Sequence, residues 1–94
     1  MAVRQPSPAD HGRSETRERP DVTRALAREQ RLLAGRLLAL RLDRKLSQEA
    51  AAEAIGLSSK HLRRMELGQS NVTLATLVAC ALAYRVPMAR LFAG

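Results

Sequence analysis

Apolar side chains recur with helical spacing along most of the chain after residue 21. In residues 22–42 the leucines return at intervals near multiples of 3.6 residues, and arginines separate them. The leucines of this pattern are Leu26, Leu33, Leu37 and Leu40. The pattern predicts a first helix over residues 22–42, and Asp21 or Thr23 is a suitable cap for its start.

Two short helical runs follow, and a single glycine separates them. Ser47 can cap the first run, because its hydroxyl can accept hydrogen bonds from the free amides of the first turn. Gly56 ends that run, since glycine adopts the left-handed conformation at little cost. Ser58 caps the second run, which continues to about Leu67. The arrangement predicts a helix-turn-helix over residues 47–67.

Two further helices are predicted toward the C-terminus. Thr73 caps a fourth helix, and Pro87 suits the first turn of a short fifth helix that ends near Phe92. The apolar residues of the fourth helix follow the i, i+3, i+4, i+7, i+8 pattern: Leu74, Leu77, Val78, Ala81 and Leu82. No stretch has the alternation of a strand. The sequence therefore predicts an all-α, compact five-helix domain over residues 22–94.

Residues 1–21 differ in composition from the rest of the chain. They contain three prolines, a glycine and many charges, and almost no large apolar side chains. Such a segment cannot bury enough surface to offset its ordering entropy, so it is predicted to be a disordered N-terminal arm. A role as a basic arm on DNA is disfavoured, because its arginines are matched by aspartates and glutamates.

Composition narrows the class of partner and the compartment. Lys and Arg number 16 against 9 Asp and Glu, a formal net charge of +7, which suggests a polyanionic partner such as nucleic acid. Tyr84 and Phe92 are the only aromatics, which argues against single-strand binding by base stacking. Cys80 is the only cysteine, so an internal disulfide is excluded. With no signal-peptide pattern or apolar span, the chain is expected to be cytoplasmic.

The sequence indicates neither catalytic nor metal-binding groups. His61 has no second His, Cys or carboxylate at ligand spacing, so no metal site is predicted. Glu49 and Glu53 are four residues apart on a solvated helix face rather than an acid–base pair. No set of nucleophile, base and orienting group is present. We expect a protein without a cofactor that is not an enzyme.

The helix after Gly56 has two chemically different faces. Ala51, Ile55, Leu57, Leu62 and Met65 supply an apolar wedge beneath the turn. The opposite face carries Ser59, Lys60, Arg63 and Arg64. These side chains can donate hydrogen bonds to phosphates or base edges, and arginine suits a bidentate pair with guanine. In isolation such a face is more often simply solvated; the surrounding motif favours contact with DNA.

That motif resembles the XRE family of bacterial and phage regulators, the lambda-repressor and Cro type of helix-turn-helix domain. The residues that carry the resemblance are Leu46, Ser47, Gln48, Glu49, Ala52, Gly56, Leu57, Ser58, Leu62, Glu66, Leu67, Gly68, Leu74, Leu77, Ala81, Leu82, Leu91 and Phe92. They cover roughly residues 33–93. The resemblance implies a lambda-repressor-like fold and a sequence-specific regulator of transcription that binds double-stranded DNA and is encoded by a bacterium or phage.

The resemblance also implies roles for individual residues. Gln48 is similar to the glutamine that contacts a phosphate and supports the reading helix, and Arg41 with Glu66 resembles a structural salt bridge. The residues assigned to DNA are Gln48, Ser58, Ser59, Lys60, His61, Arg63, Arg64, Ser70 and Asn71. Among them, Ser59, Lys60 and Arg64 are expected to face base edges. An exposed His61 that contacts no base fits the sequence as well as one that does.

Four features depart from the family pattern. Ala51 stands where leucine is usual, which removes core volume unless Leu37 or Leu77 moves in. Leu67 replaces a common polar residue, and the pair Tyr84-Arg85 replaces a more usual Leu-Gly. The long extension of the first helix before Leu33 is unusual and could serve dimerisation.

A lone reading helix contacts few base pairs, so a homodimer on a pseudo-palindromic operator is expected. Met88, Leu91 and Phe92, or the outer leucines of the first helix, are the candidate interface, although Leu91 and Phe92 could equally close the core. A different class remains open: an antitoxin or other module that binds a partner protein, with or without autoregulation on DNA. A basic amphipathic membrane binder is disfavoured, because charged residues interrupt the apolar face of the first helix.

Overall fold

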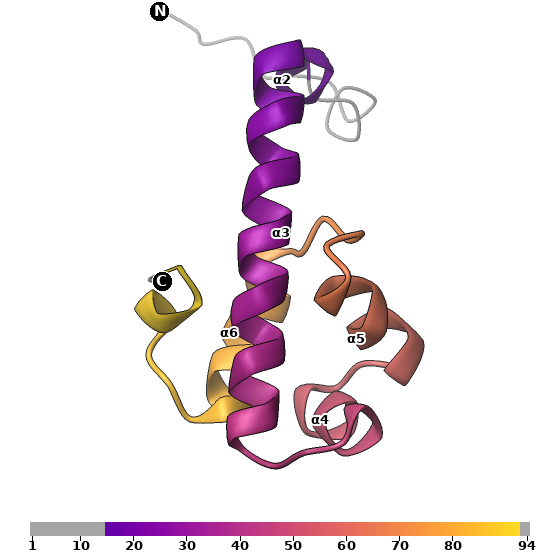
Figure 1. Ribbon diagram of the computed structural model, residues 1–94, viewed down its shortest axis with the longest axis vertical. Coiled ribbons are helices and arrows are strands. Elements are labelled where there is room, and N and C mark those ends of the chain that lie inside the picture. Colours follow the sequence, from indigo (N-terminus) through magenta and orange to yellow (C-terminus); the bar gives the residue numbers. More distant parts are fainter. Residues whose placement is uncertain (1–14, 93–94) are drawn as a thin grey trace, which may run out of the picture.

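The computed structural model describes residues 15–92, and all its regular structure is helical. Within these residues the order is α2 (Glu15–Glu18), α3 (Pro20–Asp43), α4 (Gln48–Ile55), α5 (Ser59–Glu66), α6 (Leu74–Tyr84) and η1 (Met88–Leu91). Helices α4 and α5 lie on one side of α3 and η1 on the other (Figure 1). The all-α class is confirmed. The predicted fifth helix is a short 3₁₀ turn, η1, rather than an α-helix.

Helix α3 begins at Pro20, two residues before the predicted start. The predicted caps are wrong: the cap position is Arg19, and no side chain closes it with a hydrogen bond. Proline fixes φ near the helical value and has no N–H to satisfy, so it starts a helix without such a cap. Asp21 lies in the first turn and pairs with Arg19 at 2.7 Å. Half of α3 projects beyond α4, α5 and α6, and α2 lies at its far end (Figure 1).

The turn between α4 and α5 has the predicted chemistry. The Ser47 hydroxyl accepts from the backbone N–H of Ala50, and the Ser58 hydroxyl accepts from that of His61. Gly56 has φ of +94°, in the left-handed region. The chain thereby changes direction over the three residues between α4 and α5, and each helix keeps a capped N-terminus.

A second glycine, Gly68, is favoured by its backbone conformation, because its φ of +74° disfavours any side chain. A Cβ there would lie 3.4 Å from the Cα of Arg31, an ordinary van der Waals distance, so the end of α5 packs beside the backbone of α3. This contact fixes where α5 stands relative to the projecting half of α3.

The core lies between α3, α4, α5, α6 and η1. Its buried members are Leu37, Leu40, Ala51, Ala52, Ile55, Leu62, Met65, Leu77, Cys80, Ala81, Tyr84 and Leu91. Ala51 and Leu37 are both fully buried, and Tyr84 is the largest side chain that is fully buried. The tyrosine at this unusual family position thus supplies core volume.

The end of α6 also departs from the expected pattern without losing its cap. Arg85 adopts the left-handed conformation, with φ of +56°, where glycine is the common residue. Its N–H donates to the carbonyls of Ala81 and Leu82. Arg44, just after α3, donates from Nε to the carbonyl oxygen of Tyr84 at 2.8 Å. A cation at the negative end of α6 stabilises this helix end.

Residues 15–21, part of the predicted arm, form α2 and the first residues of α3. Residues 1–14 lie outside the described residues, so the disordered arm and its boundary stay a prediction. Across residues 15–92, no helix has both the length and the apolar character that crossing a membrane requires.

Candidate nucleic-acid interface

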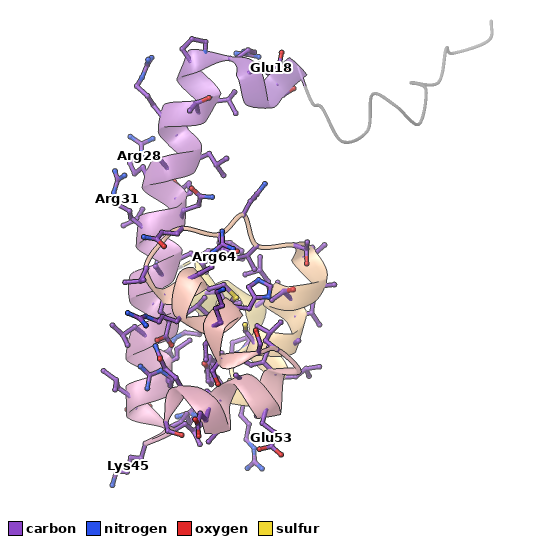
Figure 2. The ribbon with its side chains drawn as sticks, turned by 90° about the vertical axis from the view of Figure 1, so that its right-hand side faces the viewer. Glu18, Arg28, Arg31, Lys45, Glu53 and Arg64 are labelled. Atoms are coloured by element: carbon purple, nitrogen blue, oxygen red, sulfur yellow. The ribbon has the colours of Figure 1, made fainter. Side chains whose placement is uncertain are left out.

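Helix α5 divides its side chains between the core and the surface. Leu62 and Met65 are buried in the core. On the outer side Lys60, Arg63 and Arg64 are exposed, as is His61, whereas Ser59 is half-buried. Arg64 stands on the side of α5 that faces the viewer in Figure 2. The amphipathic pattern therefore places a cationic surface on the outside of a short, capped helix.

The N-terminal half of this surface is hollowed. Ser58, Lys60, His61 and Arg64 line an open depression of about 240 Å³. The Ser58 oxygen accepts a hydrogen bond from its own helix, which leaves the hydroxyl proton available to donate. The depression thus offers hydrogen-bond donors and positive charge at one place, which suits an anionic or carbonyl-bearing partner.

A buried ionic network fixes the position of α5. Nε of Arg41 donates to one carboxylate oxygen of Glu66 at 2.7 Å and Nη2 to the other at 3.1 Å, so the predicted ion pair is bidentate. Nη1 donates to the carbonyl of Leu46 at 2.9 Å. The side chains of Arg41 and Glu66 are only 11% and 4% exposed. The hydrogen bond to Glu66 raises the pKa of Arg41 above its ordinary value, so the guanidinium keeps its charge.

Gln48 joins this network from the first turn of α4. Its Nε2 donates to Glu66 Oε1 at 3.0 Å. The network therefore connects α3, α4 and the end of α5 through one carboxylate. The amide of Gln48 retains one N–H and its carbonyl oxygen for a further partner.

The loop after α5 is attached to α3 by a contact that was not predicted from the sequence. Nε2 of Gln30 donates to the carbonyl oxygen of Ser70 at 3.2 Å. Ser70 is half-buried and Asn71 is exposed. A sequence signal was present, because Gln30 is a polar residue four positions after Leu26 and seven before Leu37, on the apolar side of α3.

The predicted dimer residues fall into three different environments. Leu91 is fully buried, so its placement in an interface is wrong and the alternative, closure of the core, holds. Met88 is half-buried against the core, and Phe92 is 54% exposed. The reason is the 3₁₀ turn: it points Leu91 inward and lets the carbonyl oxygen of Leu91 accept from Nη1 of Arg36 at 3.4 Å.

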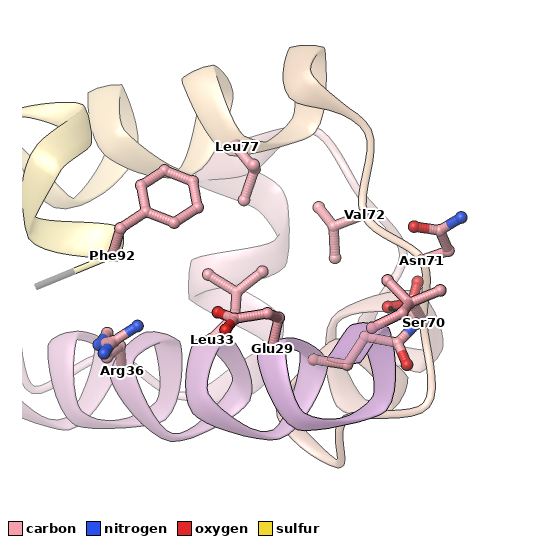
Figure 3. Close-up of a pocket in the computed structure, with 10 residues that line it drawn as sticks. Glu29, Leu33, Arg36, Ser70, Asn71, Val72, Leu77 and Phe92 are labelled. Carbon is pink, nitrogen blue, oxygen red and sulfur yellow. Dashed lines mark hydrogen bonds between the residues drawn. The ribbon is translucent and has the colours of Figure 1, made fainter. Parts of the chain in front are cut away.

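A second hollow lies between α3, α6 and the loop of residues 69–73 (Figure 3). Its volume is about 190 Å³. The residues around it are Leu26, Glu29, Gln30, Leu33, Arg36, Ser70, Asn71, Val72, Leu77 and Phe92. In Figure 3, Leu33, Val72, Leu77 and Phe92 face the space between the helices. The lining is chiefly apolar, and its few charged groups form no catalytic set.

The Cys80 thiol and the possible metal ligands of the described residues do not form a reactive site. Cys80 is fully buried, and burial raises the pKa of its thiol to about 11, which keeps it protonated near neutral pH. Among the described residues, no three His, Cys, Asp or Glu side chains gather as metal ligands do. The candidate site is therefore the outer surface of α5 with its supporting contacts.

Comparison with known proteins agrees with this geometry. The helix-turn-helix family HTH_3 matches residues 37–91, which is more than half of the chain. The chain belongs to this family. The XRE-type resemblance is thereby confirmed, and the match includes α4, α5, α6 and η1 but leaves out the projecting half of α3.

Two solved structures are similar to this HTH_3 chain. The restriction-modification controller protein C.AhdI from Aeromonas hydrophila is 33% identical, with a TM-score of 0.66, and the match covers 67% of this chain and 96% of that one. An HTH_3 family transcriptional regulator from Vibrio cholerae is 31% identical, with a TM-score of 0.68 over 71% of this chain. This chain spans only 38% of the Vibrio regulator. A search of curated proteins found no match.

Proposed function

We propose that this HTH_3 protein is a transcriptional regulator that binds double-stranded DNA at a specific sequence. The observation that carries the proposal is the surface of α5, where Lys60, Arg63 and Arg64 stand exposed on a helix capped at its start and tied at its end by Glu66. An α-helix fits the major groove, and its outer side chains then reach base edges. The two similar structures, a controller protein and a transcriptional regulator, support this class.

The residues would divide the work between bases and phosphates. Lys60 and Arg64, which are exposed and line the depression on α5, would meet base edges. The half-buried Ser59, next to Lys60, would join them. Arg63, Ser70 and Asn71 would meet the sugar-phosphate backbone. The network of Arg41, Glu66 and Gln48 would act indirectly, by holding α5 at a fixed distance from α4.

We also propose that the protein acts as a homodimer through the outer face of α6. This helix has no charged residue over Leu74–Tyr84. Three large apolar side chains stand at i, i+4 and i+8, and Leu74, Val78 and Leu82 are 68%, 41% and 75% exposed. Such a stripe in contact with water favours association, and two copies would place two reading helices on half-sites about 34 Å apart.

The DNA-binding proposal is tested by selecting duplexes from a random pool and titrating the selected site by fluorescence anisotropy. We expect Arg64→Ala to weaken the selected site by about 1–3 kcal/mol and to relax base preference at one position. Arg90→Ala is the matched control, because Arg90 is also exposed but lies on η1, on the other side of α3 from α5 (Figure 1). Equal losses on selected and random duplexes would contradict base reading by Arg64.

The dimer proposal is tested by sedimentation equilibrium. Leu82→Asp should shift the protein to a monomer and reduce its affinity for a two-half-site duplex, because a charge in an apolar interface must be desolvated. Leu42→Asp is the control, since Leu42 is 59% exposed at the far end of α3. If Leu82→Asp sediments as wild type does, the α6 interface is wrong, whatever the result on DNA.

A further inference from the structure

The projecting half of α3 carries a row of arginines that the α5 site does not include. Arg24, Arg28 and Arg31 follow at i, i+4 and i+7, so they share one side of the helix, and all three are exposed. None of them has a side-chain hydrogen bond or ion pair within residues 15–92. In Figure 2, Arg28 and Arg31 extend from the same edge of α3. We call Arg24, Arg28 and Arg31 the arginine row.

The arginine row does not stabilise the helix that carries it. Like charges at i, i+4 destabilise a helix by about 0.2–0.5 kcal/mol per pair. The carboxylate within the stretch, Glu29, lies on another side of α3, at the hollow near α6 (Figure 3), and Asp21, three residues before Arg24, is paired with Arg19. A solvated helix normally intersperses charges of both signs, whereas here the positive charges are gathered. An external anion is the group that this arrangement fits.

The arginine row continues the cationic surface of α5. Backbone and side-chain atoms of Arg31 lie 3.4–3.6 Å from the position of a Cβ on Gly68, the glycine just beyond the end of α5. The last turn of α5 holds Arg63 and Arg64. The Arg31 end of the arginine row therefore stands beside the C-terminal end of α5, whose last turn carries two cations.

The length of the row matches the spacing of phosphates. From Arg24 to Arg31 the helix rises about 10 Å, at 1.5 Å per residue. Each DNA strand carries one phosphate per about 3.4 Å of the duplex axis, so the row spans about three phosphates of one strand. Helix and strand thus present opposite charges at comparable density.

We propose that the arginine row is a second DNA contact, which binds phosphates of the duplex that flanks the site read by α5. This proposal rests on the proposed DNA-binding function. The row lies in the part of α3 outside residues 37–91, so it would add a sequence-independent anchor to the segment shared with HTH_3 proteins. It would raise affinity for all duplexes and leave base preference unchanged.

The test compares the full chain with its R24Q/R28Q/R31Q variant over about 50–200 mM salt. Two duplexes are titrated: one extends past the selected site on both sides, and one is trimmed to it. Glutamine keeps the helix propensity, so circular dichroism should show an unchanged fold. Arg90→Gln is the matched single-charge control.

On the long duplex, the plot of log K against log salt should be less steep for the variant than for wild type. The difference should be about 0.9 per lost phosphate contact, or about 2.7 for three contacts. Wild type should then lose about 40-fold more affinity than the variant across that salt range. The loss should be the same on selected and random long duplexes, and on the trimmed duplex the two proteins should bind alike.

Three outcomes would overturn the proposal. Unchanged slope and affinity in the variant would refute the arginine row and leave the DNA-binding function standing. A loss confined to the selected sequence would assign the arginines to specificity instead. If wild type binds none of the duplexes, both the proposed DNA-binding function and the DNA contact of the arginine row are refuted. Binding to acidic vesicles or to an acidic protein would then identify the class of partner.

Discussion

Replacing Arg41 by methionine tests whether the ionic network holds α5 in place. The guanidinium makes two hydrogen bonds to Glu66 and one to the carbonyl of Leu46. Methionine keeps much of the side-chain length and volume but removes all three. The Glu66 carboxylate, which is 4% exposed, would keep only the hydrogen bond from Gln48. A buried charge without its counter-ion is then the main cost.

The expected loss is large for a domain of this size. Breaking one side of a buried pair costs about 3–5 kcal/mol. A domain of about 80 residues has a total free energy of unfolding of about 4–12 kcal/mol. At about 4–8 °C per kcal/mol, the melting temperature should fall by roughly 12–40 °C.

Chemical denaturation followed by circular dichroism measures this loss, and the chain supplies a matched control. The Arg19–Asp21 pair has the same 2.7 Å distance but side chains that are 62% and 59% exposed, so Arg19→Met should cost far less than Arg41→Met, because water screens the pair. Combining Arg41→Met with Glu66→Leu should recover most of the loss, because no unpaired charge remains. Equal effects of Arg41→Met and Arg19→Met would refute the reasoning.

Three further predictions concern the core and the end of α6. The hydroxyl of Tyr84 is buried without a hydrogen-bond partner among residues 15–92, so Tyr84→Phe should raise the free energy of unfolding by about 1 kcal/mol in urea denaturation. A loss of similar size would reveal a partner. Arg85 has φ of +56°, and Arg85→Gly should stabilise the protein by roughly 0.5–1 kcal/mol in the same assay, because relief of strain exceeds the entropy cost of glycine. Burial raises the pKa of the Cys80 thiol from 9.0 to about 11, so between these pH values the folded protein keeps a proton that the unfolded chain loses. The free energy of unfolding should therefore be unaffected by this group below pH 9 and should fall by about 2–3 kcal/mol as pH rises toward 11. Cys80→Ala should show a shallower fall over that range, and identical pH profiles would contradict the assignment.

Much of the fold could be predicted because its signals are local. Ser47, Gly56 and Ser58 act through hydrogen bonds and dihedral angles within a few residues of themselves, so their effect does not depend on the rest of the chain. The same holds for Thr73 at the start of α6. The start of α3 differs from the prediction because Asp21 and Thr23, which are cap-type residues, follow a proline that needs no side-chain cap.

The candidate site was predicted only in part. The exposed face of α5 follows from its amphipathic spacing, since a buried Leu62 and Met65 force the intervening cations outward. The link from Gln30 to Ser70 joins residues 40 positions apart, and that from Gln48 to Glu66 joins residues 18 apart. Spacing along the chain does not specify such pairs, because they depend on how the helices pack.

The sequence by itself determined which segments are helical, where most of them are capped and which side of each carries charge, because these properties depend on neighbouring residues. Tertiary structure alone decided which apolar side chains are left for a partner: Leu91 and Leu82 are chemically equivalent, yet one is fully buried and the other 75% exposed. The physical reason is that burial is a property of the packed assembly of helices. A leucine is withdrawn from water only where another element reaches it, and η1 folds back onto the core while the outer face of α6 has no neighbour among the described residues.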